Sequence, residues 1–266
     1  MKIKIRINKR TIGGNHPAKW DEVTAKNFVS IARFFNGNVM DPSRRIVLFF
    51  DLLSLNPRQR RRLPELSDES PEDIRLIEAM LNAGNFLSET PAPDKWFIPF
   101  VRIGLKKYFA PRPTLAGSSF REFMYADTLY QQFFQSQSGE IIWQLASVLY
   151  RRRGKEKDDL REPFIEGNFN AEAAKWKTVN GYIPEAIFYN YKICRSYIEQ
   201  MYPRLFPVKE QKPDEEAEPT PPPSEPIWLS MLDALCDGDL AKMREYEESE
   251  VHSVLRLMNN AAEKRR

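Results

Sequence analysis

PDEEAEPTPPPSE, residues 213–225, interrupts a chain that otherwise has the composition of a folded protein. Five of these thirteen residues are proline, and none is a large apolar residue. Such a stretch cannot bury enough apolar surface to fold, and its prolines keep it extended. It therefore predicts three parts: a mainly helical body over residues 1–208, a proline-rich acidic linker over 209–225, and a C-terminal helical module over 226–266.

The C-terminal module has two apolar stripes at helical spacing, separated by the helix-breaking sequence CDGDL, residues 236–240. Ser249 is a candidate cap for the second stripe, so the module is predicted to be a helical hairpin. A module this small seldom holds together without a metal, a disulfide or a partner. We therefore predict that its stripes bind a partner. The predicted partner-binding residues are Trp228, Met231, Leu232, Leu235, Val251, Val254, Leu255 and Met258.

Strand signals are concentrated at the N-terminus of the body. MKIKIRIN, residues 1–8, alternates apolar and basic residues with the period of a half-buried strand. Gly13-Gly14 is expected to turn the chain toward a short second strand. Helix starts are predicted at Thr24, Asp41-Pro42 and Ser70-Pro71. The predicted fold class is mainly α: a helical domain with a small N-terminal β element, plus a linker-tethered C-terminal helical hairpin.

The middle of the body alternates helical patterns with one aromatic loop. FREFMYADTLYQQFF (residues 120–134) and EIIWQLASVLYRRR (residues 140–153) are predicted helices. PAPDKWFIPF, residues 91–100, is predicted to be an irregular loop whose aromatic residues either anchor a partner or join the core. A later helix is predicted to start at Pro184. Its apolar face comprises Ile187, Tyr191, Cys194, Ile198 and Met201.

The composition favours a cytosolic globular protein. Charged residues make up 29% and hydrophobic residues 42% of the 266 residues, which is ordinary for a soluble domain. The longest apolar runs are too short to span a bilayer, and the first ten residues lack the apolar core of a signal peptide. The cysteines Cys194 and Cys236 lie within helical patterns in different segments, so both are predicted to be buried free thiols.

Charge is distributed unevenly along the chain. Residues 1–208 contain 32 Lys and Arg against 23 Asp and Glu, whereas residues 209–266 contain 8 against 14. An acidic tail on a basic body indicates that the two could touch or compete for one partner. The basic runs Arg58–Arg62 and Arg151–Lys157 could contact nucleic acid through phosphates. Alternatively, they lie at helix ends, where basic residues are favoured and stay solvated.

No catalytic or metal-binding motif is indicated by the sequence. His16 and His252 lack partners at triad or zinc spacing, and GGNHP, residues 13–17, lacks the frame of a phosphate-binding loop. Asp127 lies among aromatic residues of a predicted helix, where burial could make it a general acid. The favoured interpretation is that Asp127 instead hydrogen-bonds a neighbouring Arg or Tyr in the core. We therefore expect no enzyme activity, no cofactor and no metal.

Three motifs together resemble proteins encoded in the tail-assembly region of bacterial phages and prophages. They are Trp20–Thr24 (WDEVT) followed by a helix with Phe28; Leu145–Arg151 (LASVLYR); and Trp228 with Leu235-x-x-Gly238-Asp239 after a variable linker. The resemblance implies a tail assembly chaperone. Such a chaperone is non-enzymatic, keeps the helical tape-measure protein soluble and presents it to tail-tube subunits in the cytoplasm of the bacterial host.

The resemblance also implies the partners: a tape-measure or tail-tube protein, with a homo-oligomer as a further expectation and no membrane. Two other functions remain open from the sequence. One is a structural subunit of the tail or virion, whose acidic C-terminal segment masks a surface until assembly. The other is a nucleic-acid-binding protein that uses its basic body.

Overall fold

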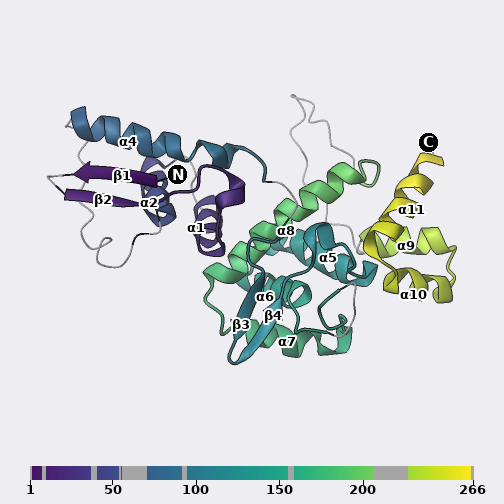
Figure 1. Cartoon of the computed structure of the whole chain (residues 1–266). Helices are drawn as coiled ribbons and strands as arrows, with labels where there is room; N and C mark the ends of the chain where they lie inside the picture. Colours follow the sequence, from purple (N-terminus) through teal and green to yellow (C-terminus); the bar gives the residue numbers. More distant parts are fainter. Residues whose placement is uncertain are drawn as a thin grey trace. The chain divides into compact units, whose positions relative to one another are not determined.

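The computed structural model describes residues 2–7, 10–36, 41–53, 55, 71–91, 95–154, 159–206 and 227–264. These residues are mostly helical, with two small antiparallel β-hairpins (Figure 1). The prediction of a mainly α fold with a small N-terminal β element is therefore confirmed. No helix within the described ranges is long and apolar enough to cross a membrane.

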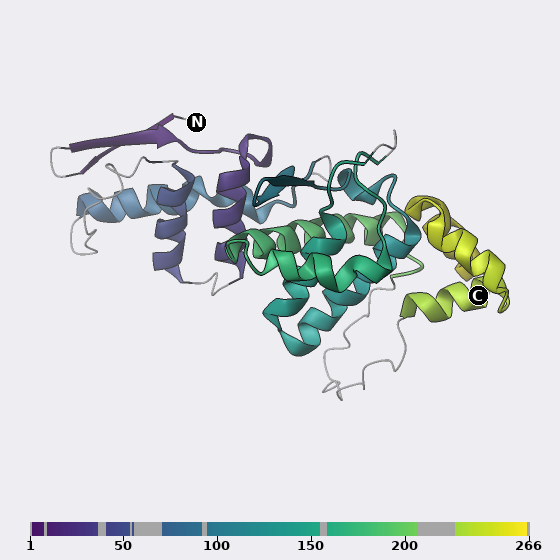
Figure 2. The same cartoon turned by 90° about the horizontal axis from the view of Figure 1, so that it is seen from below.

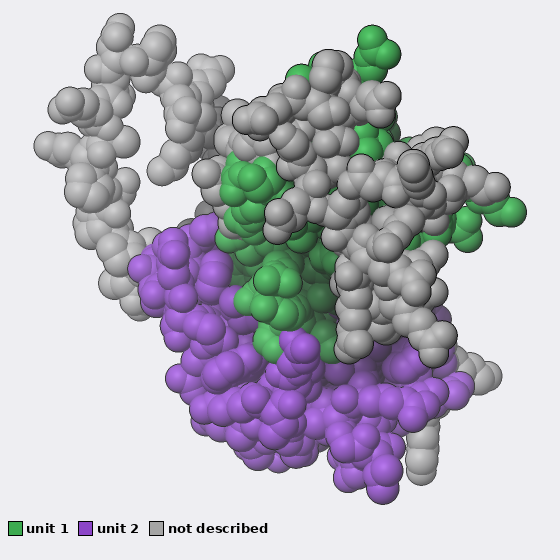
Figure 3. Space-filling view, turned by 90° about the vertical axis from the view of Figure 1, so that its left-hand side faces the viewer, with its two compact units in different colours: residues 1–92, 181–189 green, residues 93–180, 190–266 purple. Residues whose placement is uncertain are grey.

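The chain folds into two compact units, coloured separately in Figure 3. Unit 1 comprises residues 1–92 and 181–189, and unit 2 comprises residues 93–180 and 190–266. This grouping differs from the expected division, because the predicted body of residues 1–208 is shared between the units. The C-terminal segment, which we define as the described residues 227–264, belongs to unit 2.

Unit 1 combines the N-terminal hairpin with short helices. Strand β1 (Lys2–Ile7) pairs antiparallel with β2 (Arg10–Asn15). The helical elements are η1 (Trp20–Glu22), α1 (Ala25–Phe35), α2 (Pro42–Leu52), α4 (Pro71–Ala83), η2 (Asn85–Ser88) and the first half of α8 (Tyr182–Met201). The predicted caps at Thr24 and Asp41 are confirmed, since each side chain accepts a hydrogen bond from a first-turn backbone N–H. Ser70 lies outside the described residues.

The expected turn at Gly13-Gly14 is wrong. Both glycines lie inside β2, where they pair with Lys4 and Ile3. A side chain at Gly14 would place its Cβ 2.1 Å from the carbonyl oxygen of Leu53. Gly14 therefore permits a close approach between this strand and the end of α2, which is a different use of glycine from a turn.

Unit 2 contains the second hairpin and the remaining helices. Its elements are β3 (Phe100–Ile103), β4 (Lys106–Phe109), η3 (Pro113–Leu115), α5 (Phe120–Ser136), α6 (Gly139–Leu149), η4 (Glu166–Asn168), α7 (Phe169–Trp176), the second half of α8, α9 (Ile227–Cys236), α10 (Leu240–Glu248) and α11 (Val251–Lys264). Figure 2 shows the chain from below, with the yellow to yellow-green helices α9–α11 together near the C-terminus. Of the apolar face predicted for α8, Met201 differs, because it is 51% exposed at the last helical position.

The described residues 95–100 of the aromatic loop belong to unit 2. Trp96, Phe97 and Ile98 are buried, and Phe100 begins β3. Polar contacts hold this irregular backbone in place: Trp96 Nε1 donates to the Arg112 carbonyl at 3.0 Å and the Tyr150 hydroxyl donates to the Ile98 carbonyl at 2.5 Å. These aromatic residues are therefore packing residues, which leaves little of them to anchor a partner.

The C-terminal segment has three helices where the sequence predicted a hairpin of two. Asp237 and Gly238, both with positive φ, end α9, and Asp239 caps α10. Ser249 does not cap α11. Its place is taken by Glu250, whose carboxylate accepts the backbone N–H of Ser253 at 3.0 Å.

Candidate functional site

The C-terminal segment packs on one face of α5, and we call this face the docking site. Ser119 caps α5 by accepting the backbone N–H of Glu122 at 3.2 Å. From this start the helix directs Phe120, Phe123 and Asp127 to one buried face at helical spacing. The docking site is therefore aromatic, with a single carboxylate in it.

Asp127 accepts three hydrogen bonds although none of its surface is exposed. Its Oδ2 accepts Trp228 Nε1 at 2.6 Å and Gln131 Nε2 at 2.6 Å, and its Oδ1 accepts Arg195 Nε at 2.5 Å. A buried carboxylate is tolerated only when it is paired and hydrogen-bonded. The favoured interpretation of Asp127, a hydrogen bond to a neighbouring arginine, is confirmed.

Three phenyl rings surround the indole of Trp228. The ring centroids of Phe120, Phe123 and Phe206 lie 6.2, 4.9 and 5.5 Å from that of Trp228, with edge-to-face interplanar angles of 90°, 67° and 61°. Trp228 is consequently only 3% exposed. We call these rings, together with Asp127, the indole site.

Arg195, from α8, contacts two residues of the indole site, Asp127 and Phe206. Its guanidinium carbon lies 5.1 Å from the ring centroid of Tyr130 and 5.3 Å from that of Phe206. Arg195 is also ion-paired with Glu199, one turn later on α8. It is therefore fixed in place by rings on two sides and balances the charge of Asp127.

A short β-bridge joins the C-terminal segment to the start of α5. Ser119 and Glu250 pair antiparallel: Val251 N donates to the Ser118 carbonyl at 3.0 Å, and Phe120 N donates to the Ser249 carbonyl at 2.9 Å. Both bonds use main-chain atoms only. The bridge therefore fixes the register of the C-terminal segment on the docking site independently of side-chain identity.

Charge complementarity adds to the bridge. Arg121 donates from both Nε and Nη2 to Oε2 of Glu247, at 3.1 and 2.6 Å, and lies 3.9 Å from Glu248. The hydrogen bonds that Arg121 donates to Glu247 raise the pKa of Arg121. The acidic tail thus contacts a basic residue of its own chain, which is one of the arrangements that the uneven charge distribution indicated.

His252 links α11 to two other elements of unit 2. Its Nε2 lies 2.9 Å from the carbonyl oxygen of Thr114, which can only accept, so Nε2 carries the proton. Its Nδ1 therefore accepts the hydroxyl of Tyr202 at 2.9 Å. These contacts give His252 a structural role in holding α11 against unit 2.

Six of the eight predicted partner-binding residues are buried in the described conformation. They are Trp228, Leu232, Val251, Val254, Leu255 and Met258, each at most 3% exposed. Met231 and Leu235 are half-buried. The body of the same chain covers part of this apolar surface, so these residues can contact a partner only after the C-terminal segment has moved.

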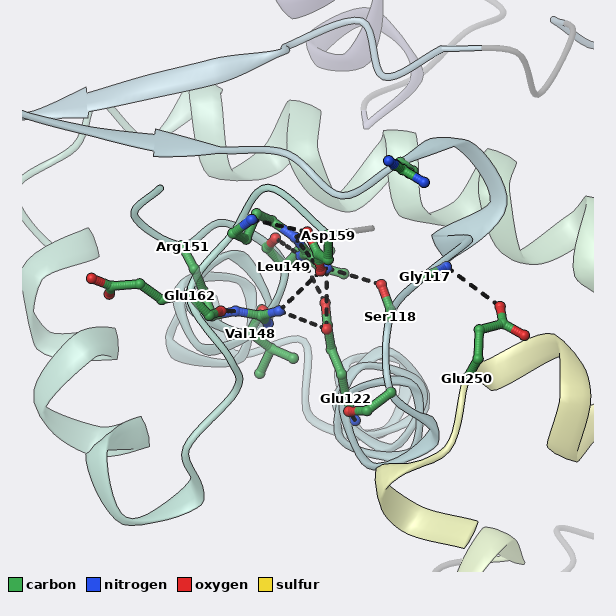
Figure 4. A network of polar contacts seen from close by, with 12 residues as sticks. Gly117, Ser118, Glu122, Val148, Leu149, Arg151, Asp159, Glu162 and Glu250 are labelled. Carbon is green, nitrogen blue, oxygen red and sulfur yellow. Dashed lines mark hydrogen bonds and ion pairs between the residues drawn. The ribbon is translucent and has the colours of Figure 1, made fainter. Parts of the chain in front are cut away.

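A network of buried charges lies behind the β-bridge (Figure 4). Arg161, 1% exposed, contacts the Ser118 hydroxyl at 2.9 Å, Glu122 Oε1 at 2.7 Å and Asp159 Oδ2 at 2.6 Å. Arg151 adds a contact of 2.7 Å to Glu122 Oε2. The network fixes the segment that carries Ser118 and Glu122, and so positions the backbone atoms that pair with the C-terminal segment.

This network corrects, for Arg151 alone, the expectation that the basic run stays solvated, since Arg153 is exposed as expected. The Arg151 side chain is 11% exposed, because it is ion-paired with Glu122 and lies 3.6 Å from Asp159. Residues 155–157 of the run lie outside the described residues, as does the other basic run, Arg58–Arg62. The prediction of free thiols is confirmed, since Cys194 and Cys236 are unpaired and buried.

Sequence reasoning missed several residues of the docking site. It identified Asp127 and Trp228 separately, but it did not connect them and did not find Arg195 or Phe206. A signal was available: a tryptophan on an apolar stripe needs an acceptor for its N–H when buried, and Asp127 was the only acid on an aromatic helix face. The β-bridge could not be predicted from the sequence, because its hydrogen bonds join main-chain atoms and require no particular side chain.

Among the described residues, no cluster of three or more His, Cys, Asp or Glu side chains could hold a metal ion. What the chain does must therefore be inferred from its own contacts, above all from those of the docking site. Comparison of the chain with protein-family models, with curated proteins and with solved structures finds no match.

Proposed function

We propose that this protein is a non-enzymatic assembly chaperone of phage or prophage tails that acts in the cytoplasm of the bacterial host. Its C-terminal segment detaches from the docking site and binds a helical client of the tape-measure type. The observation that carries the proposal is that Trp228, the first residue of the predicted client-binding stripe, is already covered by helix α5 of the same chain. A surface that stays covered until the client arrives protects an unoccupied chaperone from aggregation.

The connection between body and C-terminal segment supports detachment. The rings of Phe206 and Trp228 are 5.5 Å apart, yet 21 residues, 207–227, lie between them in the chain. A few residues would suffice to join two such close points. A chain of 21 residues can span about 70 Å when extended, so the segment can leave the docking site and remain tethered.

The contacts of the docked state are of a kind that a client can replace. They include helix stripes on an aromatic helix face, one main-chain bridge and one partly exposed ion pair. Hydrogen bonds of Trp228 and His252 add to them. Each apolar side chain of this size contributes about 1.5–3 kcal/mol when it is buried. A client with long apolar helical stripes offers comparable burial, and tethering keeps the effective concentration of the segment in the millimolar range.

The proposal is tested by co-expressing the protein with a phage tape-measure protein and measuring how much client stays soluble and co-purifies. Deleting residues 227–266 removes the stripe and should abolish capture while circular dichroism shows that the body stays folded. Arg121→Glu keeps the stripe but places a third carboxylate near Glu247 and Glu248, so it should favour detachment and increase capture.

Arg102→Glu is the matched control, because Arg102 is an exposed arginine on β3. It carries the same change of charge and should leave client capture unchanged. If the truncated protein still keeps the client soluble, the proposal is wrong. If the protein is instead retained in mature particles at fixed stoichiometry, it is a structural tail subunit.

A further inference from the structure

We infer that the indole site on α5 is a receptor for a tryptophan side chain, and that the client occupies it with a tryptophan of its own once Trp228 has left. This inference rests on the proposed function and names the feature of the client that the body recognises. The expected ligand is an amphipathic client helix with a tryptophan near its start, since Trp228 is the second residue of α9.

The chemistry of the site selects an indole. Asp127 is fully buried, and its Oδ2 points at the ring nitrogen of Trp228 at 2.6 Å. A carboxylate only accepts hydrogen bonds, and indole is the one large aromatic side chain whose N–H lies on the ring itself. Phenylalanine and leucine would fill the space between the rings but offer no donor. The site therefore discriminates by hydrogen bonding as well as by shape.

The acceptor is also held by side chains that lie outside the C-terminal segment. Arg195 and Gln131, which also donate to Asp127, come from α8 and α5. Phe120, Phe123 and Phe206 likewise belong to the body. Trp228 is thus the one part of the arrangement contributed by the C-terminal segment, and the receptor is pre-organised for a replacement.

When Trp228 leaves the indole site, the site loses contacts that a new ligand can restore. One donor to a buried carboxylate is lost, and the edges of three phenyl rings lose their contact. An unsatisfied acceptor in an aromatic surround is unfavourable, so a second N–H-bearing ring is preferred over an aliphatic side chain. A client helix that lacks tryptophan would bury the rings but leave Asp127 one donor short.

The position of the site also suits exchange. Phe206 and Trp228 lie on either side of residues 207–227 in the chain. Trp228, the second residue of α9, therefore lies at the tethered end of the C-terminal segment. The bridge at Glu250 and the ion pair of Glu247 are made by later residues, so they can hold the remaining helices while the indole site is empty.

The test uses the full-length Trp228→Ala variant and free indole as the probe, with binding measured by calorimetry and by the rise in melting temperature. Indole should bind with a stoichiometry of one, as small aromatic molecules enter cavities made by large-to-small substitutions. 1-Methylindole has the same ring but no N–H, and it should bind at least about tenfold more weakly, which corresponds to 1.4 kcal/mol. Wild-type protein, with Trp228 in place, should bind neither.

If Trp228→Ala does not fold, Trp228→Phe provides the second variant, because it keeps a ring in the site. A peptide with the sequence of residues 227–236 should then displace the C-terminal segment, as seen by faster hydrogen exchange in α11. The same peptide with phenylalanine at the tryptophan position should not. Equal binding of indole and 1-methylindole, or equal action of the two peptides, overturns the inference.

Client capture separates this inference from the proposed function. Selective indole binding, combined with client capture that free indole inhibits in Trp228→Ala, supports both. Selective indole binding with no client capture by any variant supports the receptor and refutes the proposed function. Client capture without selective indole binding refutes the receptor alone. A dimer formed when Trp228 of a second copy enters the site would appear in size-exclusion chromatography and would refute the client as the occupant.

Discussion

The indole N–H of Trp228 donates to the carboxylate of Asp127 across 2.6 Å, although the two residues are 101 positions apart in the chain. This single contact joins the C-terminal segment to the middle of α5. It explains why an acid is tolerated on an aromatic helix face, and it fixes which end of α9 enters the body.

Trp228→Phe should weaken docking by about 1–3 kcal/mol, because it removes the donor from a buried acceptor while keeping most of the ring. Hydrogen exchange in α9 and α11 should accelerate, whereas exchange in α6 should not change. Leu229→Ala is the control, since Leu229 is on the same helix and 42% exposed. Equal acceleration in both variants would show that the hydrogen bond contributes nothing.

Limited proteolysis should cut first within residues 209–225, because this stretch lacks apolar residues and is rich in proline. The two fragments should nevertheless co-elute in size-exclusion chromatography, because noncovalent contacts hold the C-terminal segment on the docking site after the linker is cut. Repeating the digestion on Arg121→Glu should release the C-terminal fragment. Resistance to cleavage throughout residues 209–225 would contradict the sequence-based description of the linker.

Asp127→Asn should lower the free energy of unfolding by about 3 kcal/mol and abolish no chemical activity. The reason is that Arg195 loses the charge that balances it in a mostly buried setting. Urea unfolding followed by circular dichroism measures the effect, with Glu140→Gln at an exposed ion pair as the control. A turnover that disappears in the folded Asp127→Asn protein would show instead that Asp127 is catalytic.

Unit 1 should lose stability in mild acid because of His16. Burial lowers the pKa of His16 from 6.5, and its ring is stacked on Phe49 with centroids 5.0 Å apart. The unfolded chain therefore binds a proton at a higher pH than the folded chain does. The stabilisation from a neutral His16 is complete above pH 6.5 and declines as the pH falls toward the lower folded pKa.

Melting temperatures between pH 8 and pH 5 measure this loss. His16→Gln removes the titrating group while keeping a polar side chain, so the melting temperature of this variant should vary less over that range. His252→Gln serves as the comparison. If His16→Gln retains the full acid sensitivity of the wild type, other groups are responsible for it.

Local features of this fold could be predicted from the sequence, because local rules determine them. Thr24 and Asp41 predict helix starts, because a cap side chain accepts the backbone N–H of a residue only two or three positions later. The hairpin of β3 and β4 was missed, since its four-residue strands carry no clear alternation and Gly104-Leu105 alone marked the turn. Gly14 was misinterpreted because its neighbour, Leu53, is distant in sequence.

The docking site was only partly predictable for a related reason. The stripe from Trp228 to Met258 could be recognised, but a stripe fits a partner and the protein's own body equally well. The choice depends on Arg195 and Phe206, which lie 68 and 79 residues beyond Asp127 in the sequence. Such non-local pairings depend on how α5 and α8 meet, and no local pattern encodes that.

The bridge between Ser119 and Glu250 has a consequence for how the protein can diversify. Its two hydrogen bonds join main-chain atoms, so the bridge itself does not depend on side-chain identity provided that Phe120 and Val251 do not become proline. Ser119 and Glu250 are constrained separately, because their side chains cap α5 and α11. If Trp228 is also kept, the residues on the remaining surface of α9–α11 can change without loss of docking. Under the proposed function, selection can therefore change which client is bound while the contacts of the docked state are kept.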